Sequence, residues 1–158
     1  MKATFIAKAA VIAALYTILT FIANAMGMSN GVIQLRFSES LCILPLFTSA
    51  AIPGLFAGCI LSNILTGCAL WDIVFGSIAT LIGALGARIF TKRLRCLAPL
   101  PTVISNTLII PFILSYVYGI SGSIFYFMLT VGIGEIISCM LLGNLLLLFF
   151  DKRNIKKL

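Results

Sequence analysis

The sequence predicts an all-α integral membrane protein, folded as a bundle of six transmembrane helices. Hydrophobic residues make up 61% of the 158 residues and charged residues only 9%, whereas soluble domains carry about 25% charged residues. Long apolar stretches separate the charges, several of them near the length of about 20 residues that crosses a bilayer. The basic residues cluster at both ends of the chain and once between them. We therefore expect one transmembrane domain over residues 1–158.

The first three helices are predicted from apolar length and proline position. The stretch 3–26 is long enough to cross the membrane once. No charged residue occurs in the next long apolar stretch, which Pro53 and Gly54 interrupt. This interruption predicts two short helices, at 37–50 and 54–68.

The last three helices follow from the remaining apolar stretches. One stretch that ends at a basic cluster predicts a fourth helix at 73–87. The charge-free stretch 96–134 has 39 residues, about 58 Å of helix, which is too long for one crossing. A turn rich in Gly and Ser at 119–123 divides it. We expect a fifth helix at 99–118 and a sixth at 123–150.

The charges also predict how the bundle is oriented in the plasma membrane. With the N-terminus in the cytosol, six crossings return the C-terminus to the cytosol and place ten of the eleven basic residues there. These ten are Lys2, Lys8, Arg88, Lys92, Arg93, Arg95, Lys152, Arg153, Lys156 and Lys157. This distribution obeys the positive-inside rule. We interpret the net charge of +7 as a topology signal that also attracts lipid headgroups, and not as a nucleic-acid footprint, because no basic stripe lies on a water-soluble face.

Four ionisable residues lie at the outer ends of the predicted helices or inside them. Such groups cost about 2.5–3.5 kcal/mol each on membrane-insertion scales, so each is a candidate functional residue. Arg36 and Glu39 begin the second helix, Asp72 precedes the fourth, and Glu135 lies near the middle of the sixth. We expect the three carboxylates to converge on one cavity that opens outward. One positive and three negative charges would favour a cationic or hydrogen-bond-donating ligand.

Structural roles compete with ligand binding at some of these positions. Arg36 and Glu39 are three residues apart and could pair with each other. Asp72 directly after Trp71 is typical of a helix N-cap beside an interfacial tryptophan. Glu135 has neither a nearby cap role nor a local partner, which favours a functional role.

Small and amide side chains predict how the helices pack. Residues four apart that allow close helix contact are Ala9 and Ala13, Ala10 and Ala14, Gly54 and Gly58, and Gly83 and Ala87. The glycine pairs favour packing inside the bundle, whereas the first helix could also present its alanines to another protein. Asn63 and Asn106 favour hydrogen bonds between helices, with ligand contact as the alternative.

Catalysis, a metal site and a cofactor are not expected. The chain has no His, which removes the commonest general base and a common zinc ligand. It has no G-x-x-x-x-G-K-[ST] motif for ATP, and its five Cys form no C-x-x-C pair. We therefore expect neither an enzyme nor an ATPase.

Several stretches resemble the QueT family of queuosine-precursor transporters, which are substrate-binding S components of energy-coupling factor (ECF) importers. Two of these stretches are 33–39 and 71–81, and they contain the most specific patterns, R-x-S-E at 36–39 and D-x-x-F-G-S-x-A-T-L at 72–81. Four further similar stretches are 44–47, 51–55, 97–101 and 131–135. The similarity runs in order across nearly the whole chain.

The resemblance implies a six-helix subunit that binds a small vitamin-like substrate from outside. It implies docking on a transmembrane coupling subunit with two cytosolic ATPases, and a substrate that is queuine or a 7-deazaguanine-type precursor. The family's alanine motif maps onto Ala9 and Ala13, which implies that this face of the first helix is the docking face.

The chemistry of such a substrate suggests residue roles. A 7-deazaguanine presents N–H and NH₂ donors side by side, and one carboxylate accepts both. We expect Glu135 or Glu39 to take this edge, with Asp72 as the next candidate. Arg36 is expected to orient Glu39 or to contact the ring carbonyl. Trp71 or a nearby aromatic residue is expected to stack on the base.

Two other functions remain open at this point. The first is a small ion- or proton-coupled carrier that uses Glu39, Asp72 and Glu135 as a relay. The chain shows no internal repeat of the kind common in such carriers. The second is a membrane scaffold or assembly subunit that does not transport.

Overall fold

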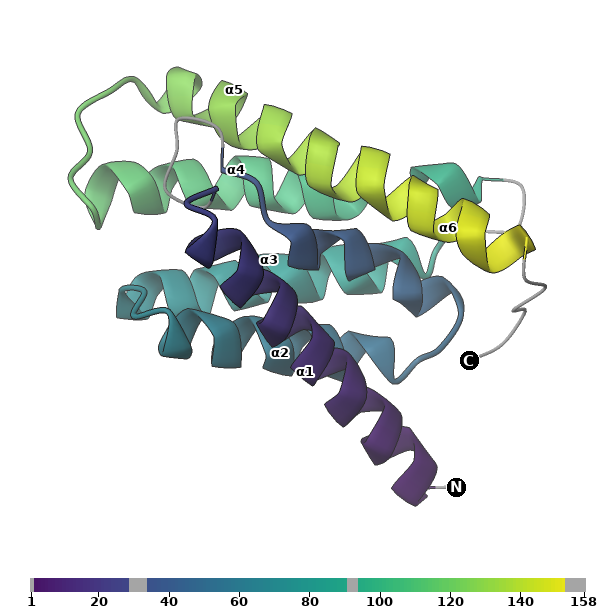
Figure 1. The fold of residues 1–158 in the computed structure, drawn as a ribbon. Helices are drawn as coiled ribbons and strands as arrows, with labels where there is room; N and C mark the ends of the chain where they lie inside the picture. Colours follow the sequence, from purple (N-terminus) through teal and green to yellow (C-terminus); the bar gives the residue numbers. More distant parts are fainter. Residues whose placement is uncertain (1, 29–33, 91–93, 153–158) are drawn as a thin grey trace.

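A computed structural model describes residues 2–28, 34–90 and 94–152, and all regular structure in this part of the chain is helical. Figure 1 shows the helices running back and forth along one common direction, with α1 crossing the others obliquely. The elements are α1 (Lys2–Ala25), η1 (Phe37–Leu46), α2 (Ala51–Leu65), α3 (Leu70–Ala87), η2 (Arg95–Leu97), α4 (Leu100–Tyr116), α5 (Ile124–Glu135), η3 (Ile136–Leu142) and α6 (Gly143–Lys152). The predicted all-α class is confirmed.

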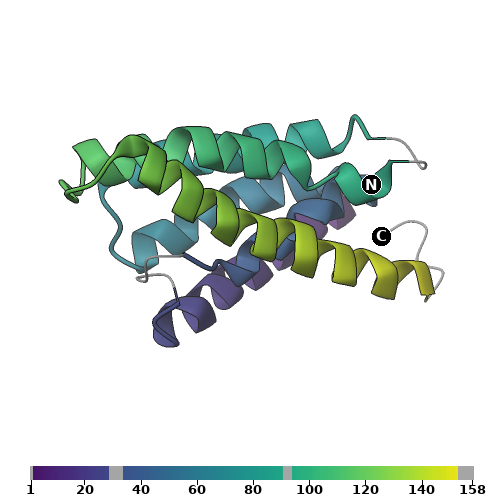
Figure 2. The ribbon, with the colours of Figure 1, turned by 90° about the horizontal axis from the view of Figure 1, so that it is seen from above.

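Four helical stretches are long and apolar enough to cross a membrane. They are Lys2–Ala25, Leu70–Ala87, Arg95–Tyr116 and Ile124–Lys152. The last is continuous because α5, η3 and α6 follow one another without a break, as both ribbon views show (Figure 2). The two helices η1 and α2 are also apolar but shorter.

The second helix differs from the α-helix expected at 37–50. It is a 3₁₀ helix, η1, of ten residues. A 3₁₀ helix rises about 2.0 Å per residue where an α-helix rises 1.5 Å, so this segment extends about 20 Å and not 15 Å. Hydrophobic pattern does not distinguish the two kinds of helix over so short a stretch. Because the 3₁₀ winding is more extended, ten residues of η1 span a greater length of the bundle than ten residues of an α-helix would.

The third helix begins at Ala51, and not at residue 54 as expected. Pro53 therefore lies in the first turn of α2, where its missing N–H removes no intrahelical hydrogen bond. The helix ends at Leu65, and Gly67 just beyond it has a φ of 74°. Glycine adopts this left-handed conformation without steric cost, which allows the tight turn into α3.

The 3₁₀ helix η1 is the central element of the bundle. It packs against α1, α2, α3, η3 and α6. Seven of its ten residues are buried, and they include both polar Ser38 and Glu39 and the apolar run Leu41–Leu44. Two apolar clusters contact it, one towards α1 and α2 and one towards α4 and α6. A short apolar helix with a polar first turn thus lies at the centre of the bundle.

Helices α1 and α2 pack through small residues. A methyl group on Gly54 would lie 2.8 Å from the Ala9 carbonyl oxygen, and one on Gly58 would lie 2.7 Å from Cβ of Tyr16. Ala13 is buried in the same contact. The glycine pair therefore packs inside the bundle as expected. The face of α1 that carries Ala9 and Ala13 is directed towards α2 and not outward.

One end of the bundle carries the basic residues and is called the basic end below. α1 begins there and α6 finishes there (Figure 1). The described basic residues at this end are Lys2, Lys8, Arg88, Arg95 and Lys152. The others assigned to the cytosol lie outside the described residues. A salt bridge of 3.1 Å between Arg95 and Asp151 joins η2 to α6 at this end.

Candidate ligand-binding site

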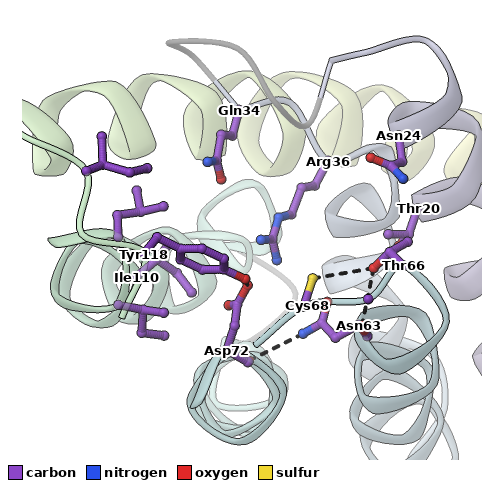
Figure 3. Close-up of a pocket in the computed structure, with 14 residues that line it drawn as sticks. Thr20, Asn24, Gln34, Arg36, Asn63, Thr66, Cys68, Asp72, Ile110 and Tyr118 are labelled. Carbon is purple, nitrogen blue, oxygen red and sulfur yellow. Dashed lines mark hydrogen bonds between the residues drawn. The ribbon is translucent and has the colours of Figure 1, made fainter. Parts of the chain in front are cut away.

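A polar cavity of about 340 Å³ lies at the end of the bundle opposite the basic end. Figure 3 shows side chains from α1, the segment before η1, α2, α3, α4 and the segment after α4 surrounding it. Its lining is Thr20, Asn24, Gln34, Arg36, Asn63, Thr66, Gly67, Cys68, Asp72, Ile110, Ile113, Leu114, Tyr118 and Ile120. The volume lies in the range of about 300–1,000 Å³ that is usual for small-molecule sites.

Arg36 reaches the cavity from the segment that leads into η1. Its backbone N–H donates a hydrogen bond of 3.2 Å to Oγ of Ser138 in the π-helical segment η3. Two residues earlier, the carbonyl oxygen of Gln34 packs directly on Gly134 of α5, where any Cβ atom would clash. The long last helix therefore positions both cavity side chains of this segment, Gln34 and Arg36, by backbone contacts.

Asp72 lines the cavity from the first turn of α3. It is not the N-cap that the sequence suggested, because the helix begins at Leu70 and Ala69 occupies the cap position. The hydroxyl of Tyr118 donates a hydrogen bond of 3.2 Å to Oδ2 of Asp72 and accepts one of 3.1 Å from the Ala69 N–H. Partial burial, together with nearby Asp72, raises the pKa of Tyr118 to about 12, so the hydroxyl keeps its proton at neutral pH.

The other carboxylate oxygen of Asp72 has no partner. Oδ1 is buried and accepts no hydrogen bond from any described residue. Asn63 donates instead to the Asp72 backbone carbonyl, at 3.4 Å, and so links α2 to α3 as expected for interhelical contact. A buried carboxylate oxygen without a donor is costly, and it marks a place where a ligand can supply one.

Glu39 lies one turn further along η1, inside the bundle. Its side chain is 2% exposed, and the hydroxyl of Tyr16 in α1 donates a hydrogen bond of 2.5 Å to its Oε1. Thr20, which lines the cavity, donates to Oγ of neighbouring Ser38 at 2.9 Å. These two bonds join the polar start of η1 to α1.

Glu135 ends α5 and is buried beside Glu39. Cys139 donates a hydrogen bond of 3.2 Å to its Oε2. Ligand atoms of Glu39, Glu135 and Cys139 lie within 4.8 Å of one another, which makes them a candidate group for a metal ion among the described residues. The side chain of Asn106 in α4 forms a hydrogen bond with Glu135 and is itself buried.

The expected convergence of three carboxylates on one cavity is therefore wrong in part. Asp72 lines the cavity, whereas Glu39, Glu135 and Asn106 do not. The charged groups of the lining are one Arg and one Asp, so the excess of negative charge expected from the sequence is not present there. The two glutamates are held away from the cavity because η1 carries Glu39 into the centre of the bundle, where α5 brings Glu135 against it.

Trp71 does not line the polar cavity. Its side chain is 56% exposed and stacks on Phe75 of the same helix, with ring centroids 5.9 Å apart. Both residues line a separate apolar hollow between α3 and α4, together with Phe112 and Tyr116. The aromatic ring available in the polar cavity is that of Tyr118.

Several cavity residues were missed by sequence reasoning. Gln34 lies in the stretch 33–39 that resembles the family, but an amide in that position was not expected to contact a ligand. Asn24, Cys68 and Tyr118 carry no such signal, because each follows or ends an apolar helix and gains its role from the helices that meet there.

The fold and the cavity together define a class of protein. A bundle with four helices of membrane-spanning length, and with a polar, charged cavity near one end, is a multi-pass membrane protein whose cavity has the size usual for small-molecule sites.

The family comparison identifies the chain more closely. The family model described as QueT transporter matches residues 6–152, nearly the whole chain. The protein therefore belongs to the QueT transporter family and is a multi-pass protein of the plasma membrane. Neither a curated protein nor a solved structure gave a match.

Two cysteines allow the direction of the cavity to be tested. Cys68 lines the cavity, whereas Cys96 is exposed near the basic end. If the basic end faces the cytosol, a membrane-impermeant maleimide added to intact cells will label Cys68, and will label Cys96 only after permeabilisation. Mass spectrometry of wild type and of the Cys68→Ser and Cys96→Ser variants measures this. Labelling of Cys96 alone in intact cells would show the opposite orientation.

Proposed function

We propose that this protein is the substrate-binding subunit of an ATP-driven ECF importer and captures queuine or a 7-deazaguanine-type queuosine precursor from outside the cell. The observation that carries the proposal is the polar cavity that holds Arg36 and Asp72 at the end opposite the basic residues. By the positive-inside rule this end faces outward. Membership of the QueT transporter family supports a role in transport.

The cavity lining suits a flat polar heterocycle. One wall is formed by the aliphatic side chains of Ile110, Ile113 and Leu114 from α4. Amides, hydroxyls and the two charged groups line the remainder. An apolar wall can cover the face of a ring while the polar groups meet the hydrogen-bonding atoms on its edge.

Glu39, Glu135 and Asn106 take a supporting role in this proposal. They lie together behind the start of η1 and connect it to α1, α4 and α5. In this position they hold the segment that carries Arg36, and they do not contact the substrate themselves.

We expect purified protein to bind its substrate without accumulating it. The chain carries no ATP-binding motif, so in the proposed importer the coupling subunit and two ATPases supply the energy. Calorimetric titration with queuine, its aminomethyl and nitrile precursors and guanine measures binding, and uptake into sealed vesicles measures transport. Saturable binding without concentrative uptake agrees with the proposal. Failure to bind any of the four would exclude the substrate class.

A second candidate is a proton-coupled carrier, favoured by the close approach of Glu39 and Glu135 inside the bundle. The same vesicles distinguish the two. A carrier would accumulate ligand when a proton gradient is imposed on vesicles that contain this chain alone, and the Glu135→Gln variant would lose that uptake.

Gly134 offers a test of how the site is built. A methyl group there would displace the Gln34 carbonyl and with it the segment leading to Arg36. We expect Gly134→Ala to weaken 7-deazaguanine binding about tenfold, the effect of roughly 1–3 kcal/mol that overpacking causes. Gly132→Ala is the matched control, because its methyl group would make an ordinary contact of 3.5 Å with Thr107. Equal affinities in the two variants would contradict this account.

The proposed docking surface lies on the exposed face of α1. The implied docking residues Ala9 and Ala13 are turned towards α2, as described above. A second set of alanines is spaced three or four residues apart, so that its members share a face. These exposed residues are Ala3, Ala7, Ala10 and Ala14. We propose that the coupling subunit packs on this second set, because small residues let helices approach closely in membranes.

Leucine substitutions separate the two faces of α1. Ala10→Leu with Ala14→Leu is expected to abolish co-purification with the coupling subunit while leaving 7-deazaguanine affinity unchanged, because neither residue touches the cavity. Ala13→Leu is expected to lower the melting temperature, because it would collide with α2 at Gly58. Normal co-purification of the double variant would place the docking face elsewhere.

A further inference from the structure

The two charges in the cavity are not paired with each other. The one salt bridge among the described residues joins Arg95 to Asp151, at the other end of the bundle. Arg36 and Asp72 nevertheless line the same cavity, and Figure 3 shows both side chains directed into the space that the labelled residues enclose. Opposite charges separated across a partly buried space gain from a polar molecule placed between them.

Neither charged group is satisfied by its described neighbours. Asp72 receives one hydrogen bond, from Tyr118, and its Oδ1 receives none. The Arg36 backbone N–H is used by Ser138, but its guanidinium makes no hydrogen bond to a described residue. Tyr118 cannot donate a second hydrogen bond to Oδ1 of Asp72, because its only hydroxyl proton is already used for Oδ2.

From this geometry we infer that the substrate bridges Arg36 and Asp72, and that this pair selects heterocycles with a guanine-type edge over those with an adenine-type edge. This inference rests on the proposed function and names the recognition that the cavity would perform. Arg36 only donates hydrogen bonds, and a carboxylate such as that of Asp72 accepts them. The ligand must therefore turn a carbonyl oxygen towards Arg36 and an N–H or NH₂ group towards Asp72.

A ring with the opposite pattern is rejected for a physical reason. An adenine-type ring carries an amino group in the position of the guanine carbonyl. It would set a donor against Arg36 and shut this half-buried charged group off from water without a partner, which costs more than the loss of one hydrogen bond. Sites built on charged partners of fixed polarity discriminate strongly for this reason.

The test compares two ratios of dissociation constants. Full-length protein is titrated with 7-deazaguanine and 7-deazaadenine, and wild type is expected to bind the first about 100-fold more tightly or better. Arg36→Gln and Asp72→Asn each introduce an amide, which can turn to donate or accept. The ratio is therefore expected to fall below about tenfold in each variant. A purely structural role would lower both affinities together and leave the ratio unchanged.

The controls use the same chemical changes at the other end of the bundle. Arg95→Gln and Asp151→Asn remove a charge from each member of the basic-end salt bridge, and both are expected to keep the wild-type ratio.

Wild type supplies a second measurement that needs no variant. Removing the ring carbonyl, as in 2-amino-7-deazapurine, or the exocyclic amine, as in 7-deazahypoxanthine, is expected to weaken binding.

Each outcome decides between the proposals. An unchanged ratio in both variants, or a wild type that prefers 7-deazaadenine, overturns the bridging role of the pair. If no 7-deazapurine binds, the proposed substrate is wrong, and 2-amino-4-oxopteridine and 2,4-diaminopteridine replace the two probes, because they differ in the same edge group. If the protein then selects 2-amino-4-oxopteridine in a way that depends on Arg36, the inference is retained. If neither pteridine binds, the inference is overturned.

Discussion

The structure depends on the burial of one carboxylate. Glu39 lies almost fully inside a membrane bundle, where an unpaired charge would cost several kcal/mol. The Tyr16 hydroxyl meets it from α1, and Glu135 and Cys139 lie against it from the last helix. Because these partners come from both ends of the sequence, the contact fixes where η1 runs through the bundle. The path of η1 in turn determines where Arg36 emerges into the cavity.

Close backbone contacts transmit this arrangement to the cavity. The Gln34 carbonyl rests on Gly134, and the Arg36 N–H is bound by Ser138 in the π-helical segment. A π-helical turn changes the direction of the side chains that follow it and is common at functional sites. The buried glutamates Glu39 and Glu135 and the polar cavity are thus connected, because the contacts around the glutamates hold the segment that carries Arg36 into the cavity.

The two ends of the bundle handle charge differently. At the basic end Arg95 and Asp151 form an exposed ion pair, which water and salt screen. At the opposite end Arg36 and Asp72 share a cavity without pairing. A salt bridge between Arg36 and Asp72 would occupy the cavity, and neither group would then be free to bind the substrate. Because the two groups are separated, both can form hydrogen bonds with a ligand. The hydrogen bond from Tyr118 offsets part of the free-energy cost of leaving Asp72 without an ionic partner.

Sequence reasoning predicted the fold more fully than the site. Apolar length and charge position predicted an all-α membrane bundle, and every expected helix corresponds to a helical stretch in the described chain. The errors lie at η1 and at the starts of α2 and α3. Pattern alone does not separate 3₁₀ from α winding, Pro53 is tolerated in a first turn, and Asp72 lies inside α3 and does not cap it. Of the expected ligand contacts, Arg36 and Asp72 line the cavity, whereas Trp71 faces the apolar surface.

The sequence by itself determined that the chain is a membrane bundle, which end carries the positive charge, and which few ionisable groups deserved study, because these properties depend on composition and order along the chain. Only the tertiary structure decided how those groups are divided. Three carboxylates on three helices look alike in sequence, yet packing buries Glu39 and Glu135 together and leaves Asp72 at the cavity. The same holds for the alanines of α1, since helix rotation decides which of them face α2. Such contacts depend on winding and rotation, which are set by the neighbouring helices and not by local sequence.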